Sequence, residues 1–381
     1  MKKTAECVII GGGIIGTAIA YNLAKNGMTD IILLEKEYLS AGSTGRCGGG
    51  IRQQWTTEAN VKLAMRSVKL FEKFESEIGH DFDYKQQGYL ILAFTDKEVD
   101  DFKKNVKMQK SLGLEVNYIT PKEAQEIVPI LNISEVKGAT YCPKDGLGNP
   151  FLSTKGYAEK AQELGATILT YTSADEIKVE KGGVSGVKTK DGWIETKRVV
   201  NAAGGHAAEI GKLAGIDFPV VPYRHQILVT EPLEPLVGPM VIDFYHGFYG
   251  SQAKHGSFIM GEGDPEEKPG INLKCNWKFL ESIQKKFTYL FPKLKDLRIV
   301  RQWSGVYAMT PDAQPIIGES ESVKGFYSAI GYSGHGYMLA PATGEVMSEI
   351  ILDGRSKTVN VDHLSMTRFK DGNFETEHNV V

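Results

Sequence analysis

The sequence predicts two kinds of architecture in one chain: an α/β part with a parallel sheet, and an α+β part built on a mostly antiparallel sheet. The α/β part is indicated by residues 7–35, where two four-residue apolar runs enclose a glycine-rich turn and a helix-like stretch. Such runs are typical of strands buried on both faces. The α+β part is indicated by residues 216–262 and 298–309, where aromatic and β-branched residues alternate in a pattern that suits antiparallel strands.

The turn between the first two expected strands carries the spacing G-x-G-x-x-G. Gly11 allows a sharp turn, Gly13 lets the backbone approach a pyrophosphate, and Gly16 lets the following helix pack on the strand. The second strand ends in Glu35, at the distance where this arrangement presents a carboxylate to a ribose hydroxyl. The segment therefore predicts a Rossmann-like dinucleotide site. Because Lys36 follows, with no arginine to bind a 2′-phosphate, NADP is disfavoured and FAD or NAD remains.

The predicted alternation of strands and helices is interrupted twice along the chain, which indicates two discontinuous domains. The nucleotide-binding domain is expected to comprise residues 1–80, 145–215 and 310–381. The second domain is expected to comprise residues 81–144 and 216–309. A chain of 381 residues is long for a single core, which agrees with more than one domain.

Four elements are expected between these landmarks. The apolar stripe over residues 58–78 predicts one helix, capped by Thr57, and a charged amphipathic helix is expected over 96–111. A strand is expected from Ile194 to Val200. A helix over 340–352 completes the set.

Composition is ordinary for a globular protein, with 41% hydrophobic and 24% charged residues. The 44 basic and 47 acidic residues give a net charge of −3, so no nucleic-acid partner is expected. Four cysteines without metal-ligand spacing indicate neither disulfides nor a metal site. The apolar stretch at residues 7–20 is interrupted by glycines and explained by the nucleotide turn. We therefore expect no transmembrane segment and a cytoplasmic location.

Residues 40–55 form a second glycine-rich segment, with several hydroxyls and two arginines. Ser43, Thr44 and Arg46 are candidate donors to phosphate or flavin oxygens. Gly48, Gly49 and Gly50 would let the backbone run beside a planar ring. The alternative is a flexible surface loop, which seldom combines glycines with Cys, Ile and Trp.

Residues 331–338, GYSGHGYM, form a second glycine-rich junction between a strand and a helix. A helix N-terminus at this place would face an electron-rich ring edge, such as a flavin carbonyl. The alternative is a simple turn.

Five segments together resemble the D-amino-acid-oxidase-type superfamily of FAD amine oxidoreductases: GGGIIG with Glu35, GSTGRCGGGIRQQW, VVNAAGG, TPDAQPIIG and GYSGHGYM. The resemblance covers nearly the whole chain. It is strongest to the branch with sarcosine oxidase, glycine oxidase and the β subunits of heteromeric sarcosine oxidases and dye-linked L-proline dehydrogenases. It implies an FAD-binding domain covered by a substrate domain, with the flavin ring between them.

The resemblance implies that cofactor contacts come from the first turn, the 40–55 segment, later strand ends and the 331–338 segment. The expected cofactor residues are Gly11, Gly13, Ile14, Ile15, Gly16, Glu35, Lys36, Ser43, Thr44, Arg46, Gly48, Gly49, Gly50, Ala174, Ala203, Gly204, Gly305, Gly331, Gly334, His335, Gly336, Tyr337 and Met338.

The same resemblance implies an active site that positions an amino acid for hydride removal from the carbon next to nitrogen. Arg52 aligns with an arginine that binds the substrate carboxylate, and Tyr307 with another active-site position. Tyr249 and His246 are candidates for orienting the amine. The alternatives are a solvated loop arginine for Arg52, and structural roles for Tyr249 and His246.

Four departures from relatives refine these expectations. Gly305 stands where the monomeric enzyme has its FAD-tethering cysteine, so FAD is expected to be non-covalent. Asn149 stands where a heteromeric β subunit has its FMN-linked histidine, which leaves FMN at a subunit interface open. Ile259 replaces an oxygen-activating lysine, and Met338 replaces a lysine that binds carboxylate.

These features favour a dehydrogenase for proline, sarcosine or a related amine, with a companion subunit or another electron acceptor. Three alternatives stay open at this point. They are a 2-hydroxy-acid or glycerol-phosphate dehydrogenase of the same superfamily, an NAD enzyme, and a non-catalytic flavin-binding subunit.

Overall fold

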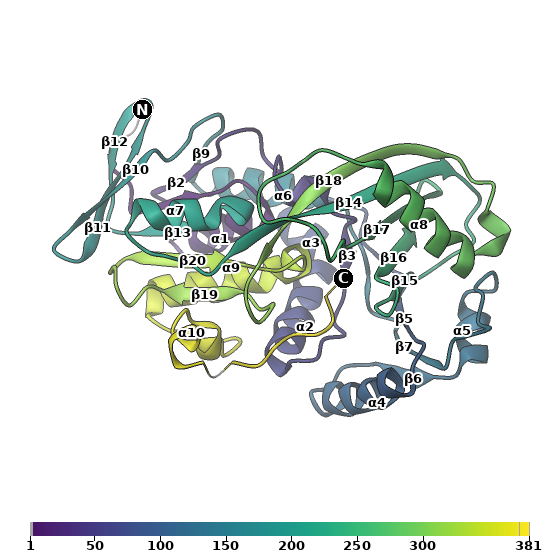
Figure 1. The fold of residues 1–381 in the computed structure, drawn as a ribbon. Helices are drawn as coiled ribbons and strands as arrows, with labels where there is room; N and C mark the ends of the chain where they lie inside the picture. Colours follow the sequence, from purple (N-terminus) through teal and green to yellow (C-terminus); the bar gives the residue numbers. More distant parts are fainter. Residues whose placement is uncertain (1–2, 373, 381) are drawn as a thin grey trace.

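The computed structural model describes residues 3–372 and 374–380. A six-stranded sheet forms the centre of the left-hand part in Figure 1. Its strands are β1 (Cys7–Ile10), β2 (Ile31–Leu34), β9 (Thr167–Leu169), β13 (Val199–Asn201), β19 (Ile316–Glu319) and β20 (Phe326–Ile330). The order is β19-β20-β13-β1-β2-β9, and all neighbours are parallel except β19 and β20.

Both faces of this sheet are covered, which explains the uninterrupted apolar runs. The ten helices of the described residues are α1 (Ile14–Lys25), α2 (Glu58–Glu72), α3 (Phe74–Ile78), α4 (Asp96–Ser111), α5 (Pro121–Ile127), α6 (Pro150–Glu163), α7 (Ala207–Leu213), α8 (Trp277–Leu290), α9 (Gly336–Asp353) and α10 (Arg368–Asp371). Helix α1 packs against α9 and α6, and α9 also packs against α2. Cys7 and Ile9 face this helical layer. Val8 and Ile10 face the opposite core, which includes residues of α7.

An eight-stranded sheet dominates the right-hand part in Figure 1. Its strands are β5 (Tyr89–Ala93), β6 (Asn117–Ile119), β7 (Gly138–Cys142), β14 (Val221–Pro232), β15 (Met240–Asp243), β16 (Phe248–Gln252), β17 (Ser257–Glu262) and β18 (Ile299–Met309). The order is β18-β14-β17-β16-β15-β5-β7-β6. Only β5 and β15 pair in parallel, and this pair joins two parts of the chain that are far apart in sequence.

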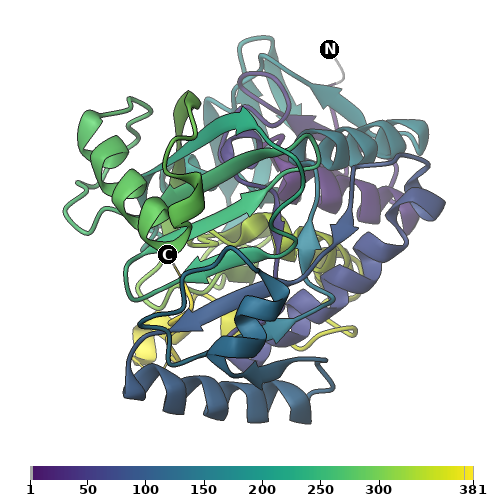
Figure 2. The same ribbon diagram turned by 90° about the vertical axis from the view of Figure 1, so that its right-hand side faces the viewer.

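Two small sheets complete the fold. Strands β10 (Glu176–Glu180), β11 (Gly183–Thr189) and β12 (Gly192–Glu195) form an antiparallel meander. Strands β3 (Gly50–Ile51), β4 (Lys85–Gln86) and β8 (Gly146–Leu147) form a short sheet in which β8 is central. Strand β3 follows the loop after residue 40 and pairs in this sheet with β8. Figure 2, in which the right-hand part of Figure 1 faces the viewer, shows α8 in green on the left and α4 in blue at the bottom.

Three details differ from the sequence predictions. The segment 58–78, expected to form one helix, forms two, because the helical hydrogen bonding is interrupted at Lys73 between α2 and α3. The single strand expected from Ile194 to Val200 is β12 followed by β13, which belong to different sheets. The expected cap of α2, Thr57, lies at the N-cap position, but its side chain accepts no hydrogen bond from the helix.

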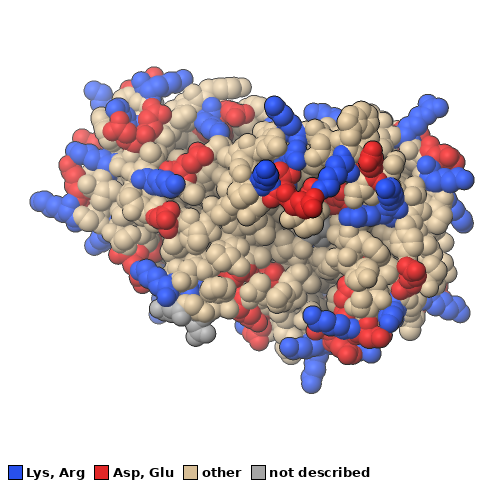
Figure 3. All heavy atoms as spheres, in the orientation of Figure 1, with Lys and Arg blue, Asp and Glu red and all other residues tan. Residues whose placement is uncertain are grey.

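The boundaries of the two domains stay a prediction. The strands of the six-stranded sheet nevertheless come from residues 7–34, 167–201 and 316–330, and those of the eight-stranded sheet from 89–142 and 221–309. Lysine, arginine, aspartate and glutamate side chains are interspersed over the face in Figure 3. Within the described ranges, the helices all fall short of the length and apolar character that crossing a membrane requires.

Candidate flavin and amino-acid site

The turn after β1 depends on the absence of side chains at two glycines. Gly11 has φ +120°, and a Cβ there would lie 2.3 Å from the carbonyl oxygen of Ala202. A Cβ on Gly16 would lie 1.9 Å from the carbonyl oxygen of Gly11, so α1 can pack on β1 only with glycine at this position. Gly13 is less confined, since its nearest neighbour would be Thr44 Oγ1 at 3.0 Å. The turn therefore brings bare backbone and the start of α1 to the sheet edge.

Polar groups suited to a dinucleotide surround this turn. The Glu35 carboxylate accepts hydrogen bonds from the N–H groups of Gly12, at 2.7 Å, and Glu37, at 2.8 Å. The N–H of Ile14 donates to Thr44 Oγ1 at 3.1 Å. The remaining N–H groups at the start of α1, including that of Ile15, have no acceptor within the helix. A helix N-terminus and a strand-end carboxylate fit the phosphates and ribose of FAD.

The donors of the 40–55 segment are used within the protein. Ser43 Oγ donates to the carbonyl oxygen of Val306 at 2.7 Å. Arg46 donates to the carbonyl oxygens of Ala41, at 3.0 Å, and Ser304, at 3.2 Å. These bonds tie the segment to β18, so it is not a free surface loop. A contact of these side chains with the cofactor stays a prediction.

The three glycines that follow meet different surroundings. A Cβ on Gly49 or Gly50 would collide with protein atoms, at 2.2 Å from the Gly148 carbonyl oxygen or 1.9 Å from Tyr89 Oη. A Cβ on Gly48 would meet nothing closer than 3.7 Å, and its neighbours are Ile227, Ile259 and Tyr249. Of these three positions, Gly48 is the one where no protein atom excludes a side chain. This is consistent with a flavin ring that lies beside Gly48 and excludes a side chain there.

The GYSGHGYM segment lies at the start of α9, which begins at Gly336, four residues earlier than expected. A Cβ on Gly334, which has φ +97°, would lie 2.4 Å from the ring of Tyr307. His335 is 2% exposed, and both its ring nitrogens lack a hydrogen-bond partner among the described residues. Burial lowers the pKa of His335 to about 4. Two orphaned polar atoms on a buried ring fit a site completed by a ligand.

The other members of this segment contact neighbouring parts of the protein. Gly331 has φ +71°. Tyr337 Oη lies 3.2 Å from Ser153 Oγ, and Met338 packs at the edge of the core. Gly336 is the first residue of the helix. Their cofactor contacts stay predictions.

Expected cofactor residues also lie near the ends of the six-stranded sheet. Lys36 Nζ lies 2.7 Å from His206 Nε2. Ala203 and Gly204 lie two and three residues after the end of β13, and Ala174 packs at the edge of the adjoining core. These positions surround the glycine turn, but their roles stay predictions.

A stack of three aromatic rings joins three strands of the eight-stranded sheet, in which β18 and β14 are neighbours and β17 lies between β14 and β16. His225 on β14 lies 4.1 Å from the Tyr307 ring on β18 and 5.6 Å from the Tyr249 ring on β16, measured between centroids. Burial lowers the pKa of His225 to about 3 and raises the pKa of Tyr307. His225 Nε2 has no hydrogen-bond partner among the described residues. The stack is therefore neutral near pH 7 and offers one free imidazole nitrogen.

His225 was missed by sequence reasoning. The available signal was a histidine within residues 216–262, which were expected to form antiparallel strands together with residues 298–309. The register that pairs His225 with Gly305 could not be read from the sequence. A Cβ on Gly305 would face Arg46 Cβ at 3.2 Å.

Arg52 lies beside this stack and is 5% exposed. Its guanidinium carbon lies 3.9 Å from the Trp55 ring centroid and 5.6 Å from that of Phe244. Nη2 donates to the carbonyl oxygen of Asn379 at 2.6 Å, and Nε has no hydrogen-bond partner in residues 3–372 and 374–380. No carboxylate of the described residues forms an ion pair with Arg52, and burial lowers its pKa. A buried cation without a counterion fits an acidic ligand. The alternative of a solvated loop arginine is wrong.

The carboxylate of Asp145 binds the two residues that follow Arg52 in the chain. Asp145 is fully buried, and it accepts hydrogen bonds from the N–H and side chain of Gln53, at 2.9 and 3.0 Å, and from Gln54 Nε2 at 3.0 Å. Gln54 Oε1 in turn accepts from Thr140 Oγ1 on β7. Burial raises the pKa of Asp145 to about 6, against the effect of these bonds. This network connects the arginine loop to the second sheet.

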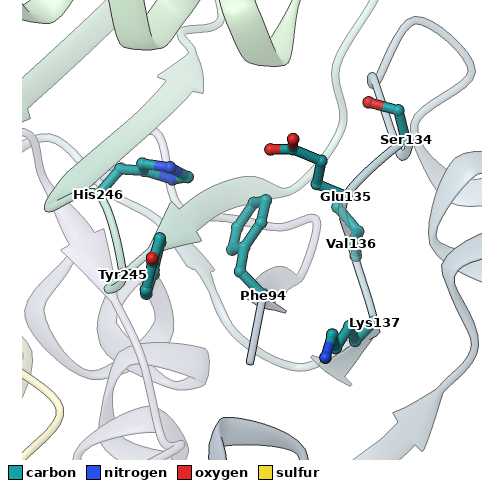
Figure 4. Close-up of a pocket in the computed structure, with 7 residues that line it drawn as sticks. All are labelled: Phe94, Ser134, Glu135, Val136, Lys137, Tyr245 and His246. Carbon is teal, nitrogen blue, oxygen red and sulfur yellow. The ribbon is translucent and has the colours of Figure 1, made fainter. Parts of the chain in front are cut away.

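His246 is not part of this arrangement. Its Nδ1 lies 2.6 Å from Asp243 Oδ2, and its ring contacts Phe94, Tyr245 and Tyr289. Figure 4 shows it at the edge of a separate pocket of about 400 Å³. The structure thus brings together Arg52, Tyr307 and Tyr249, with Trp55, His335 and His225 beside them, and places His246 elsewhere.

Comparisons with known proteins agree with this geometry. Residues 6–350 match the family described as FAD dependent oxidoreductase. The sarcosine oxidase β subunit of Arthrobacter sp is 31% identical over 383 residues, covering 99% of this chain and 94% of that subunit. The crystal structure of L-proline dehydrogenase from P. horikoshii is 44% identical, with a TM-score of 0.94, and the match covers 99% of this chain and 100% of that one. Glycine oxidase from Geobacillus kaustophilus is 26% identical, with a TM-score of 0.87 and 96% and 99% coverage.

Proposed function

The chain belongs to the family of FAD-dependent oxidoreductases, and we propose that this enzyme oxidises the C–N bond of a small, secondary amino acid such as proline or sarcosine. The sarcosine oxidase β subunit and the L-proline dehydrogenase support this substrate class by their similarity. The product would be an imine.

The observation that carries the proposal is the buried Arg52, which forms no ion pair with a carboxylate of the described residues and lies beside a neutral aromatic stack. Removing a guanidinium from water without a counterion is costly, and a bidentate carboxylate offsets that cost. The free Nε of Arg52 is available for such a contact. An amino acid bound there by its carboxylate would present its nitrogen and α-carbon to the ring stack of Tyr307, His225 and Tyr249.

FAD, when bound, supplies the hydride acceptor. The protein's task is orientation and exclusion of water, which together can provide most of the rate enhancement. The Tyr307 hydroxyl stays protonated because burial raises its pKa, and His225 stays neutral because burial lowers its pKa to about 3. These groups can orient an uncharged amine without placing a competing cation beside it.

We further propose that FAD is held without a covalent bond. Position 305 is glycine, and burial raises the pKa of the Cys47 thiol to about 11, which leaves little reactive thiolate. Acid precipitation should release the flavin into the supernatant, and flavin in the pellet would contradict the proposal.

We also propose that the enzyme is a dehydrogenase that passes electrons to a companion subunit or another acceptor. Ile259 lies next to Gly48 and cannot stabilise the negative charge that develops when oxygen is reduced. An FMN site at a subunit interface finds no support in Asn149, whose side chain accepts hydrogen bonds from the N–H groups of Phe151 and Leu152 as the cap of α6. A cytoplasmic location stays a prediction that cell fractionation would test.

The substrate proposal is tested by anaerobic titration of the FAD-loaded protein with proline, sarcosine, glycine and matched 2-hydroxy acids, followed by flavin absorbance. We expect bleaching by a secondary amino acid. Bleaching by a hydroxy acid alone would support the hydroxy-acid alternative, and no bleaching by any of these compounds would support a non-catalytic subunit.

The acceptor proposal is tested by reducing the enzyme with its best substrate and comparing reoxidation by air and by a dye. We expect the dye to be much faster. Equal rates in a protein purified alone would contradict both the dehydrogenase and the companion subunit.

A further inference from the structure

The segment 374–380 runs from the region of α10 across the N-terminus of α2 to the place where the two large sheets meet (Figure 1). Glu377 fixes it there and is 2% exposed. Its carboxylate accepts hydrogen bonds from the N–H and hydroxyl groups of Thr56 and Thr57, from Asn60 Nδ2, and from the N–H of Asn379, at 2.7 to 3.2 Å. A residue distant in sequence thus binds the two residues that precede α2 and the side chain of Asn60 in its first turn.

The charge of Glu377 suits this position. The start of a helix carries partial positive charge and free N–H groups, both of which favour a carboxylate. Burial opposes ionisation of Glu377, but the hydrogen bonds from Thr56 outweigh it, and the pKa of Glu377 lies below its ordinary value. The anchor is therefore ionised at neutral pH.

Two residues beyond this anchor, the segment touches Arg52. The carbonyl oxygen of Asn379 accepts the hydrogen bond from Arg52 Nη2 at 2.6 Å, and Asn379 Nδ2 lies 3.4 Å from the carbonyl oxygen of Gln54. Asn379 is 8% exposed. The segment thus occupies one donor of the guanidinium, while Nε has no hydrogen-bond partner within the part of the chain that the structure describes.

The TPDAQPIIG motif secures the other side of the segment. Gln314 Nε2 donates to the carbonyl oxygen of Glu375, and the N–H of Glu377 donates to the carbonyl oxygen of Asp312. The Asp312 side chain is itself fully buried in an ion pair with Arg368. The TPDAQPIIG motif, to which no cofactor contact was assigned, therefore holds residues 374–380 in place.

We propose that segment 374–380 is a fixed wall of the amino-acid site, in which Asn379 positions Arg52 through its main-chain carbonyl and limits the size of substrate that reaches Arg52. This inference rests on the proposed function for its substrate. The many hydrogen bonds to Glu377 favour a fixed wall over a plug that leaves in each catalytic cycle.

The first test measures the cover over Arg52 without using activity. The FAD-loaded protein is treated with phenylglyoxal, and modification of Arg52 is followed by peptide mass spectrometry. Glu377→Ala should release the segment and raise the modification rate about tenfold, since the anchor supplies several charged hydrogen bonds. Glu377→Gln provides a milder change should Glu377→Ala fail to fold. The matched control is Glu375→Ala, which removes an exposed carboxylate two residues away and should react like the wild type. Equal rates in all proteins would overturn the proposal.

The second test uses substrate size. In Glu377→Ala or Glu377→Gln, KM for the best small amino acid should rise about tenfold, with kcat much less affected, because Arg52 loses a positioning contact. The preference should also shift toward bulkier amino acids. A lower KM for the small amino acid would overturn the wall, because it would identify the segment as a plug. If no amine reduces the wild-type flavin, the proposed function fails, while the phenylglyoxal result still decides whether the segment covers Arg52.

Discussion

The cofactor half of the site is formed mainly by backbone atoms, whereas the amino-acid half is formed mainly by side chains. Around β1 and α1 the surface is mostly backbone, with glycines where a side chain would collide and a helix start that offers N–H groups. Around Arg52 the surface is made of side chains from separate strands: His225 from β14, Tyr249 from β16 and Tyr307 from β18. The first half depends on the shape of a short continuous segment, and the second on the register between strands far apart in sequence.

This difference teaches how each half should respond to mutation. A backbone surface fails when any side chain is added, whatever its chemistry. A side-chain surface should instead tolerate changes of shape and lose only the function of the altered group. Four substitutions would sharpen or break this distinction, and they follow from the largest expected effect to the smallest.

Gly16→Ala should abolish FAD binding and destabilise the fold by about 3 kcal/mol or more, because the new Cβ would lie 1.9 Å from a backbone oxygen. The measurements are flavin absorbance per protein and thermal unfolding. Gly42→Ala is the control, since its Cβ would meet no atom within 4 Å. Normal flavin content in Gly16→Ala would show that the turn does not depend on bare backbone.

Arg52→Lys should raise KM for the amino-acid substrate roughly ten- to a hundredfold, since an ammonium cannot reproduce the planar fork of a guanidinium. FAD content should stay unchanged, because Arg52 belongs to the side-chain half. Steady-state kinetics with a dye acceptor provide the measurement. An unchanged KM would remove Arg52 from the carboxylate site.

His225→Phe should flatten the acid limb of the stability profile. Folding lowers the pKa of His225 from 6.5 to about 3. Between these two pH values, His225 is protonated in the unfolded chain but neutral in the folded protein. The contribution of His225 to stability is therefore complete above pH 6.5 and is lost toward pH 3, at roughly 1.4 kcal/mol per pH unit. Denaturant unfolding at pH 7 and pH 5 should show a smaller difference for His225→Phe than for the wild type. Equal differences would mean that His225 is not buried as a neutral ring.

Gly48→Ala should change the stability of the FAD-free protein by no more than about 0.5 kcal/mol, because its Cβ would meet only ordinary contacts from 3.7 Å. FAD affinity should fall if the flavin ring passes beside this position. Gly50→Ala is the contrast, since its Cβ would collide with Tyr89 Oη whether or not FAD is bound. Full FAD affinity in Gly48→Ala would place the ring elsewhere.

The same difference explains which features could be predicted from the sequence. The strand, turn and helix at residues 7–25 lie within one short segment, so their spacing was sufficient to predict them. The predicted fold class and family were confirmed. His246 was predicted to orient the amine, but its ring nitrogen lies 2.6 Å from Asp243 and its side chain lines another pocket.

Long-range partners account for the rest. His225 lies beside Tyr307 only because β14 pairs with β18. The caps of α4 and α5 are local, and there Thr95 and Thr120 form complete capping boxes. At the start of α2, Thr56 and Thr57 instead donate to Glu377, which lies more than 300 residues away, and no sequence rule for helix ends reaches that far.

The interrupted course of the chain through its two large sheets has a consequence for biosynthesis. Strand β1 has β13 as a neighbour, and β5 has β15, so neither sheet can be completed until more than half of the polypeptide has been translated. Until then, apolar strand edges stay without partners and are open to association with other chains. Pairings between such distant residues also form slowly, because the intervening chain must first be ordered. Assembly after translation, under the protection of a chaperone, is the folding route that this connectivity favours.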